Sequence, residues 1–135
     1  KDLADRTGRI EEMTLQVEAR YPATVEAYAQ RLRASIEELV GSGVDEARLM
    51  TEVAVMADRS AIAEETVRLH AHIAQLRECL EKGEPVGRRI DFLVQELNRE
   101  VNTISSKSQD VPITQLAVDL KAEIEKLREQ LQNIE

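Results

Sequence analysis

The spacing of apolar residues near the C-terminus constrains the fold more than any other feature of this sequence. From residue 113 onward, apolar residues are separated by four and three positions in strict alternation: Ile113, Ala117, Leu120, Ile124, Leu127, Leu131 and Ile134. This repeat is typical of a coiled-coil seam, a narrow stripe that must pack on another helix. The sequence therefore predicts a coiled-coil-like helix from about Asp110 or Pro112, with a partner helix in the same chain or in a second copy.

Two further helices are predicted in the N-terminal third of the chain. The first runs over about residues 1–20 and should break or kink at Tyr21-Pro22, because the residue before a proline disfavours helical geometry. The second begins at Pro22 and stops at Gly41-Ser42-Gly43. We expect these two pieces to be arms that pack on another part of the protein.

A long helical hairpin should follow the N-terminal arms. Asp45 is a suitable N-cap, and residues 46–81 contain neither Gly nor Pro, so we expect one uninterrupted helix of about 54 Å. Residues 82–85, Lys-Gly-Glu-Pro, should turn the chain into a fourth helix over about 85–103. Residues 105–110 contain no apolar side chain and should form an exposed, mobile loop before the last helix.

The expected fold class is all-α: a long helical hairpin with N-terminal helices and a C-terminal coiled-coil-like helix. Aromatic residues make up only 2% of the chain, so Leu, Ile, Val, Ala and Met must build the core, as in packed helices. The chain has no initiator Met and opens inside a helical pattern. We therefore expect residues 1–43 to be arms leading in from a missing N-terminal domain, and residues 44–135 to be a C-terminal helical domain.

Charge and cysteine content narrow the classes of function. A net charge of −8 argues against non-specific binding of nucleic acid by the whole surface. Between Pro85 and Lys107, however, four basic residues face three acidic ones, so this segment alone does not repel polyanions. The single cysteine, Cys79, excludes an internal disulfide and a multi-cysteine zinc motif, and we interpret it as structural. No apolar run approaches the ~20 residues of a membrane span, so a soluble cytoplasmic protein is expected.

The segment from Gly87 to Lys107 is unusually polar for a helix and is the main candidate for a functional site. One side of it carries a carboxylate and three amides within about 40° on a helical wheel: Asp91, Gln95, Asn98 and Asn102. These groups fit either an interhelical amide network or a hydrogen-bonding strip for nucleotides or phosphates. The spacing does not decide between the two.

Charged side chains on the same helix have a structural and a functional interpretation. Glu96 and Glu100, four residues apart, are either solvated or share a hard divalent cation such as Mg²⁺ or Mn²⁺. Arg88, Arg89 and Arg99 form either surface ion pairs or bidentate contacts with phosphate.

Glu65, Arg68 and His72 share one face of the preceding helix, where His72 is either structural, a metal ligand or a general base. The grouping becomes a stronger candidate for a metal or catalytic site if the hairpin brings Glu64, Glu65 or His72 beside Asp91, Glu96 or Glu100. No glycine-rich loop precedes a Lys-Ser or Lys-Thr pair, which excludes nucleotide hydrolysis by a P-loop.

Taken together, these segments resemble the YicC-like endoribonuclease family. The resemblance rests on residues 86–93 (VGRRIDFL), residues 95–100 (QELNRE) and Ser106-Lys107-Ser108, with further agreement between residues 52 and 72 and over 120–135. It covers Gly43 to Glu135, whereas the first forty residues agree only in helical character. The resemblance implies the C-terminal half of a bacterial cytoplasmic protein, formerly described as stress-induced, that cuts RNA internally with a divalent metal and forms a ring-like homo-oligomer.

The resemblance also implies roles for individual residues. It assigns catalysis to Glu96, Glu100, Asp91 and His72, and metal binding to Glu65, Glu96 and Glu100. It assigns contact with RNA to Arg88, Arg89, Asn98, Arg99 and Lys107. The implied cofactor is Mn²⁺ or Mg²⁺, and no small-molecule cofactor or membrane is expected. The alternative is an oligomerisation scaffold and RNA adaptor, with catalysis in the absent N-terminal domain.

Overall fold

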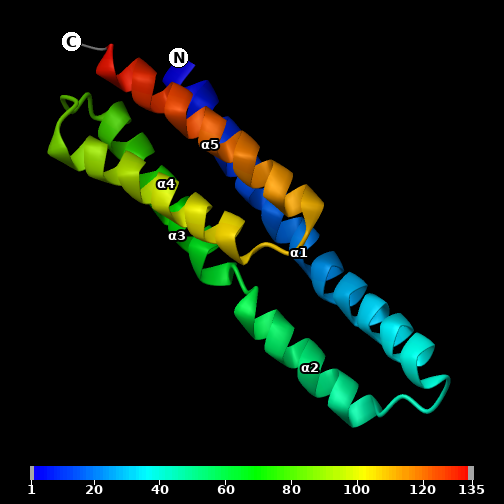
Figure 1. Cartoon of the computed structure of the whole chain (residues 1–135). Helices are drawn as coiled ribbons and strands as arrows, with labels where there is room; N and C mark the ends of the chain where they lie inside the picture. Colours follow the sequence, from blue (N-terminus) through cyan, green and yellow to red (C-terminus); the bar gives the residue numbers. More distant parts are fainter. Residues whose placement is uncertain (1, 134–135) are drawn as a thin grey trace.

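The computed structural model describes residues 2–133, and these form five α-helices with no strand (Figure 1). The helices are α1 (Asp2–Val40), α2 (Glu46–Arg59), α3 (Ala63–Glu81), α4 (Arg88–Lys107) and α5 (Val111–Gln132). The predicted all-α class is therefore confirmed. Within the described residues, no helix combines the length and the apolarity that crossing a membrane would need.

Four helical segments pack side by side as an antiparallel bundle. The first half of α1 contacts α3 and α5, and α4 contacts the same two helices from the opposite side. Neighbouring helices run in opposite directions (Figure 1). Ile10 and Val17 of α1 are fully buried together with Leu69 of α3, Leu97 of α4 and Leu120 of α5, so one core serves all four segments. The predicted hairpin is formed by α3 and α4, and the bundle holds its two helices against α1 and α5.

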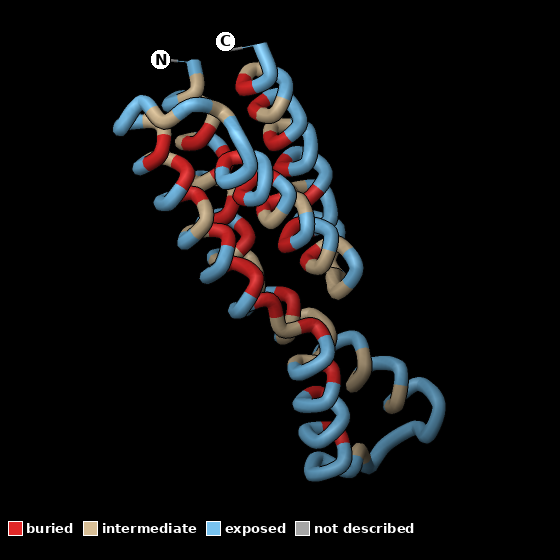
Figure 2. The backbone as a smooth tube through the Cα atoms, turned by 90° about the vertical axis from the view of Figure 1, so that its left-hand side faces the viewer, coloured by how far each residue is buried: buried red, intermediate tan, exposed pale blue. Residues whose placement is uncertain are grey.

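The second half of α1 and α2 extend away from the bundle as a two-helix arm (Figure 1). Most of the arm is exposed, in contrast to the buried inner faces of the bundle (Figure 2). Leu49, Val53 and Met56 are the buried residues of α2, and Arg33 of α1 forms an ion pair with Glu46. The division of the chain at residue 43 stays a prediction, but the first half of α1 is an integral part of the bundle.

A break or kink was predicted at Tyr21-Pro22; the break was wrong, because α1 continues through Pro22, and the kink stays a prediction. A proline inside a helix removes one backbone hydrogen bond and costs about 3 kcal/mol. Contacts on both sides compensate for this cost. Arg20 forms two hydrogen bonds with Asp110, and the Tyr21 hydroxyl donates to the carbonyl of Ala57 at 2.9 Å. Tertiary contacts thus outweigh the local preference.

The uninterrupted helix predicted over residues 46–81 was also wrong, because Ser60-Ala61-Ile62 separates α2 from α3. Side chains replace the missing helical hydrogen bonds. The carbonyl of Ala57 accepts from Tyr21, and the carbonyl of Ala61 accepts from the ammonium of Lys107 at 2.9 Å. The Ser60 hydroxyl lies 3.0 Å from that of Tyr21 and donates to the Met56 carbonyl, a bond that competes with the helical pattern.

The end of α4 and the start of α5 differ from the prediction by a few residues. Ser105, Ser106 and Lys107 are helical, so the expected loop is reduced to residues 108–110. Asp110 caps α5 by accepting a hydrogen bond from the backbone N–H of Ile113 at 3.2 Å. The predicted seam is buried from Ile113 to Leu131, while Ile134 lies outside the described residues. Because α5 packs on α1 and α4, the seam has its partner helices in the same chain.

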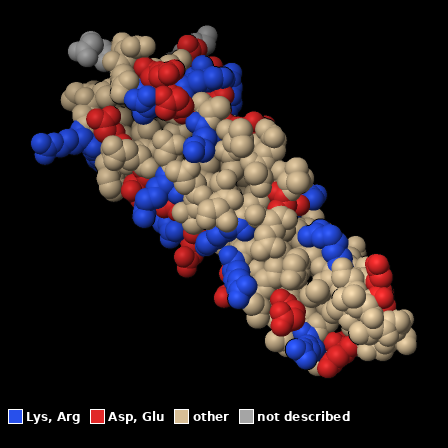
Figure 3. Space-filling model, in the orientation of Figure 1, with Lys and Arg blue, Asp and Glu red and all other residues tan. Residues whose placement is uncertain are grey.

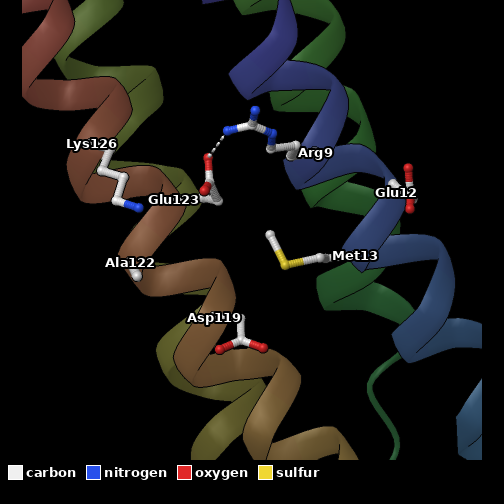
Figure 4. A pocket seen from close by; sticks show the side chains of 7 residues that line it. All are labelled: Arg9, Glu12, Met13, Asp119, Ala122, Glu123 and Lys126. Atoms are coloured by element: carbon white, nitrogen blue, oxygen red, sulfur yellow. Dashed lines mark ion pairs between the residues drawn. The ribbon is translucent and has the colours of Figure 1, made fainter.

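A shallow groove lies between α1 and α5 (Figure 4). Arg9 reaches across it to Glu123 of α5, with 3.8 Å between the guanidinium and the carboxylate, and Met13 lies at its floor between the two helices. None of the residues predicted for metal or RNA lines this groove. The groove therefore belongs to the packing of α5 and not to the candidate site.

Candidate metal centre in the helical hairpin

The hairpin brings together three of the residues predicted for catalysis. His72 of α3 lies beside Glu96 and Glu100 of α4, and each offers a ligand atom within 4.8 Å of the others. Two atoms that ligate one ion at about 2.1 Å each lie no more than about 4.2 Å apart. A small adjustment of the side chains would therefore let all three bind a single cation.

The imidazole of His72 lacks the partners that a structural histidine normally has. Both ring nitrogens are buried, and neither makes a hydrogen bond with any residue between 2 and 133. Leaving a buried polar group unpaired costs about 1–3 kcal/mol, so such groups need an explanation. A neutral imidazole is a common metal ligand, and here it lies beside two carboxylates. The donor set of one nitrogen and two carboxylates fits a divalent cation.

Glu100 is buried, with only 2% of its surface exposed, although its position four residues after Glu96 allowed a solvated pair. Arg68 of α3 compensates for its charge, because the guanidinium Nε donates to Glu100 Oε2 at 2.9 Å. Glu96 is half-buried and lies 3.4 Å from the guanidinium of Arg99 on the outer side of α4. The two carboxylates therefore occupy different environments, one inside the hairpin and one at its edge.

Glu65, which the resemblance implied as a metal ligand, is not part of this group of three. It is buried, and its Oε2 accepts from the ammonium of Lys107 at 3.1 Å and from the guanidinium of Arg68 at 3.4 Å. Its other oxygen is buried and has no hydrogen-bond partner among the described residues. Lys107, implied to contact RNA, is thus engaged with Glu65 and with the carbonyl of Ala61.

The line of polar residues from Asp91 to Asn102 does not form the interhelical network that its spacing allowed. Asp91, Gln95 and Asn102 are exposed, and Asn98 is half-buried. In the part of the chain that the structure describes, none of the four side chains makes a hydrogen bond to another helix. Asp91 is exposed five residues before Glu96 and is not in the group formed with His72.

The arginines implied for RNA binding lie on the outside of α4. Arg88, Arg89 and Arg99 are exposed; Arg89 lies 3.8 Å from Glu84, and Arg99 pairs with Glu96. Basic and acidic side chains alternate over the face seen in Figure 3, without a continuous basic surface.

Cys79 is fully buried in the core, and burial raises the pKa of its thiol, which fits the predicted structural role. The residue whose contribution was missed is Arg68, which joins Glu65 to Glu100 across the hairpin. The positions of Glu65, Arg68 and His72, three and four residues apart, placed them on one face. Only the packing of α3 on α4 shows that this face meets Glu96 and Glu100.

Comparison with known proteins identifies relatives for the whole chain. The family model described as "Endoribonuclease YicC-like, C-terminal" matches residues 17–135. A protein of Clostridioides difficile named "Probable endoribonuclease YicC" is 47% identical over 100% of the chain, and one of Haemophilus influenzae with the same name is 40% identical over 98%. These matches cover 47% and 46% of the two relatives, so the chain spans about half the length of each.

Proposed function

This chain belongs to the YicC-like endoribonuclease family, and we propose from that premise that it supplies a divalent-metal site for the internal cleavage of RNA. His72, Glu96 and Glu100 would hold the metal. The protein would act in the bacterial cytoplasm as a homo-oligomer. The observation that carries the proposal is that both ring nitrogens of His72 are buried and have no hydrogen-bond partner among residues 2–133, and that one of them lies within 4.8 Å of a carboxylate oxygen of Glu96 and of Glu100.

The donor set favours Mn²⁺ over Mg²⁺. Mg²⁺ prefers oxygen ligands and strict octahedral geometry, whereas an imidazole nitrogen suits transition metals. Glu96 and Glu100 provide the oxygens that Mn²⁺ also accepts. When bound, such an ion supplies Lewis-acid polarisation of a phosphate and a more acidic water.

The side chains around this centre would have different roles in holding the metal and in contacting RNA. Glu96 lies at the edge of the hairpin, where a phosphate can approach, while Glu100 is buried and held by Arg68. Arg99, one turn beyond Glu96, is exposed and can exchange its contact with that carboxylate for a bidentate contact with phosphate. Arg88 on the same helix adds a second exposed guanidinium. Asn98, half-buried on α4, would supply an amide contact to RNA.

Mn²⁺ binding and RNA cleavage, measured on matched variants, test this proposal. Glu96→Gln, Glu100→Gln and His72→Gln would be compared with Glu129→Gln, an exposed residue of α5. The binding of Mn²⁺ is measured on the chain by the loss of the free-ion EPR signal. Cleavage of a labelled RNA is measured in a protein of the relatives' full length. We expect the three site variants to lose both properties and Glu129→Gln to keep them.

A second function is favoured by the length of the relatives, since about half of each lies outside the matched region. The chain would then be an oligomerisation scaffold and RNA adaptor, and catalysis would lie elsewhere. Full cleavage activity of the Glu96→Gln and Glu100→Gln variants would support this adaptor function and reject the metal site. Retained oligomerisation with lost cleavage would support the metal site.

A further inference from the structure

Glu65, Arg68 and Lys107 form a continuous ionic chain that ends on Glu100. The chain crosses between the two helices of the hairpin: Lys107 of α4 contacts Glu65 of α3, and Arg68 of α3 contacts Glu100 of α4. Glu65 and Arg68 are themselves 3.4 Å apart between Oε2 and Nη2. Four charges of alternating sign thus lie in one row beside the proposed metal centre.

The two carboxylates of this row are buried, whereas the side chain of Arg68 is 44% exposed and that of Lys107 is 32% exposed. Glu65 and Glu100 are 3% and 2% exposed, so each needs a partner to offset the cost of burying its charge. Lys107 also donates to the Ala61 carbonyl, which is free because α2 and α3 are separated at that point. The ammonium therefore ties the end of α4 to the junction of α2 and α3. Removing Arg68 would leave the buried carboxylate of Glu100 without its ion pair, and removing Lys107 would leave Glu65 only the longer contact with Arg68.

The geometry of Glu100 depends on this row. Arg68 Nε donates to one carboxylate oxygen of Glu100 at 2.9 Å, which restricts the rotation of the carboxylate. The guanidinium in turn lies against Glu65, whose position is set by Lys107. Residues that orient a metal ligand contribute to metal affinity without touching the ion.

We propose that Glu65, Arg68 and Lys107 are positioning residues that fix Glu100 toward His72 and Glu96. Glu65 is then not a metal ligand, and Lys107 is not a contact to RNA phosphate. This assignment rests on the proposed function of the same centre, and it replaces the roles that the family resemblance implied for these two residues.

The test compares Lys107→Met and Glu65→Gln with Lys121→Met, an exposed lysine of α5. The affinity for Mn²⁺ is measured by EPR on the folded chain. The affinity for a labelled single-stranded RNA is measured in EDTA at several salt concentrations. Loss of an orienting residue weakens metal binding by about 10- to 100-fold, and loss of one phosphate contact lowers the salt slope by about 1.

We expect Lys107→Met and Glu65→Gln to weaken Mn²⁺ binding by at least about tenfold, with RNA affinity and salt slope unchanged. Lys107→Arg, which can still pair with Glu65, should recover part of the Mn²⁺ affinity. Lys121→Met should change neither the affinity for Mn²⁺ nor the binding of RNA. If circular dichroism shows that Lys107→Met does not fold, the Mn²⁺ affinity of Glu65→Gln tests the positioning role, because glutamine keeps the size and shape of the glutamate side chain.

Two results would overturn the positioning role. One is a lower salt slope in Lys107→Met with unchanged Mn²⁺ affinity, which would make Lys107 a phosphate contact. The other is unchanged Mn²⁺ affinity in Glu65→Gln. Either result leaves the proposed function standing if the unsubstituted chain binds Mn²⁺ through His72, Glu96 and Glu100. A chain that binds no Mn²⁺ rejects the metal centre itself, and the positioning role with it.

Discussion

Arg20 of α1 donates two hydrogen bonds to the carboxylate of Asp110, from Nε to Oδ2 and from Nη2 to Oδ1, both at 2.9 Å. Asp110 also accepts from the backbone N–H of Ile113 and so begins α5. One side chain therefore joins the middle of the longest helix to the start of the last one. The contact lies two residues from Pro22, where α1 lacks a backbone hydrogen bond.

This pair predicts an acid-dependent stability. The guanidinium of Arg20 holds the pKa of Asp110 below its usual value. The contribution of a carboxylate with a lowered pKa is present above its unfolded pKa of about 3.9 and is lost as the pH falls through the folded value. Asp110→Asn keeps a helix cap but loses the ion pair, so we expect a loss of about 1–2 kcal/mol in the free energy of unfolding at pH 7.

Urea denaturation at pH 7 and at pH 3 measures this effect. The free energy of unfolding should change less between pH 7 and pH 3 in Asp110→Asn than in the unsubstituted chain. Asp119→Asn, on the exposed side of α5, is the control and should leave that difference unchanged. Equal acid sensitivity of Asp110→Asn and the parent chain would show that the pair does not contribute.

A second prediction concerns the junction between α2 and α3. The Tyr21 hydroxyl donates to the carbonyl of Ala57 and lies 3.0 Å from that of Ser60. Tyr21→Phe leaves this carbonyl without its donor, so we expect a loss of about 1–2 kcal/mol in unfolding free energy. Hydrogen exchange of the amides over residues 57–62 should also become faster. Tyr28→Phe, a half-buried tyrosine further along α1, is the matched control; an equal effect in both variants would contradict the role of Tyr21.

The two errors about helix boundaries have a common physical cause. Pro22 should break a helix and residues 46–81 contain no breaker, yet α1 continues and the long helix is divided. Both outcomes depend on groups distant in sequence. The carboxylate of Asp110 and the backbone carbonyl of Ala57 contact the region around Pro22, while the side chains of Tyr21 and Lys107 donate to the carbonyls at the junction. Local propensity contains no information about such partners.

The apolar spacing, in contrast, was sufficient to predict which faces of α4 and α5 are buried in the bundle. The seam from Ile113 to Leu131 and the stripe of α4 from Ile90 to Ile104 are buried as their periodicity predicts. The candidate site was predictable only in part. The spacing of Glu96 and Glu100 suggested a shared cation, but the third donor, His72, is on another helix. Its nearness depends on how far the turn at residues 82–87 shifts α3 along α4.

The seam of α5 gives a third prediction. Leu127 is fully buried, and its replacement by Asp would place a charge in the core in addition to removing apolar contacts. Core truncations alone cost about 2–5 kcal/mol, so Leu127→Asp should lower the melting temperature strongly or prevent folding. Val118→Asp, on the exposed face of the same helix, should have little effect. Similar thermal denaturation curves for the two variants would refute a buried seam.

The last prediction separates a metal-binding histidine from a structural one. Both ring nitrogens of His72 are buried without a partner in the part of the chain described, whereas His70 lies 3.0 Å from the carboxylate of Glu18 and 3.6 Å from that of Glu11. Removing an unpaired buried polar group relieves a cost of about 1–3 kcal/mol. In EDTA, His72→Leu should therefore raise the melting temperature, while His70→Leu should lower it by breaking contacts between α3 and α1.

Added Mn²⁺ at about 100 times its dissociation constant should stabilise the unsubstituted chain and His70→Leu by about 2.7 kcal/mol, but not His72→Leu. A His72→Leu variant that is destabilised in EDTA and still stabilised by Mn²⁺ would show that His72 is a packing residue.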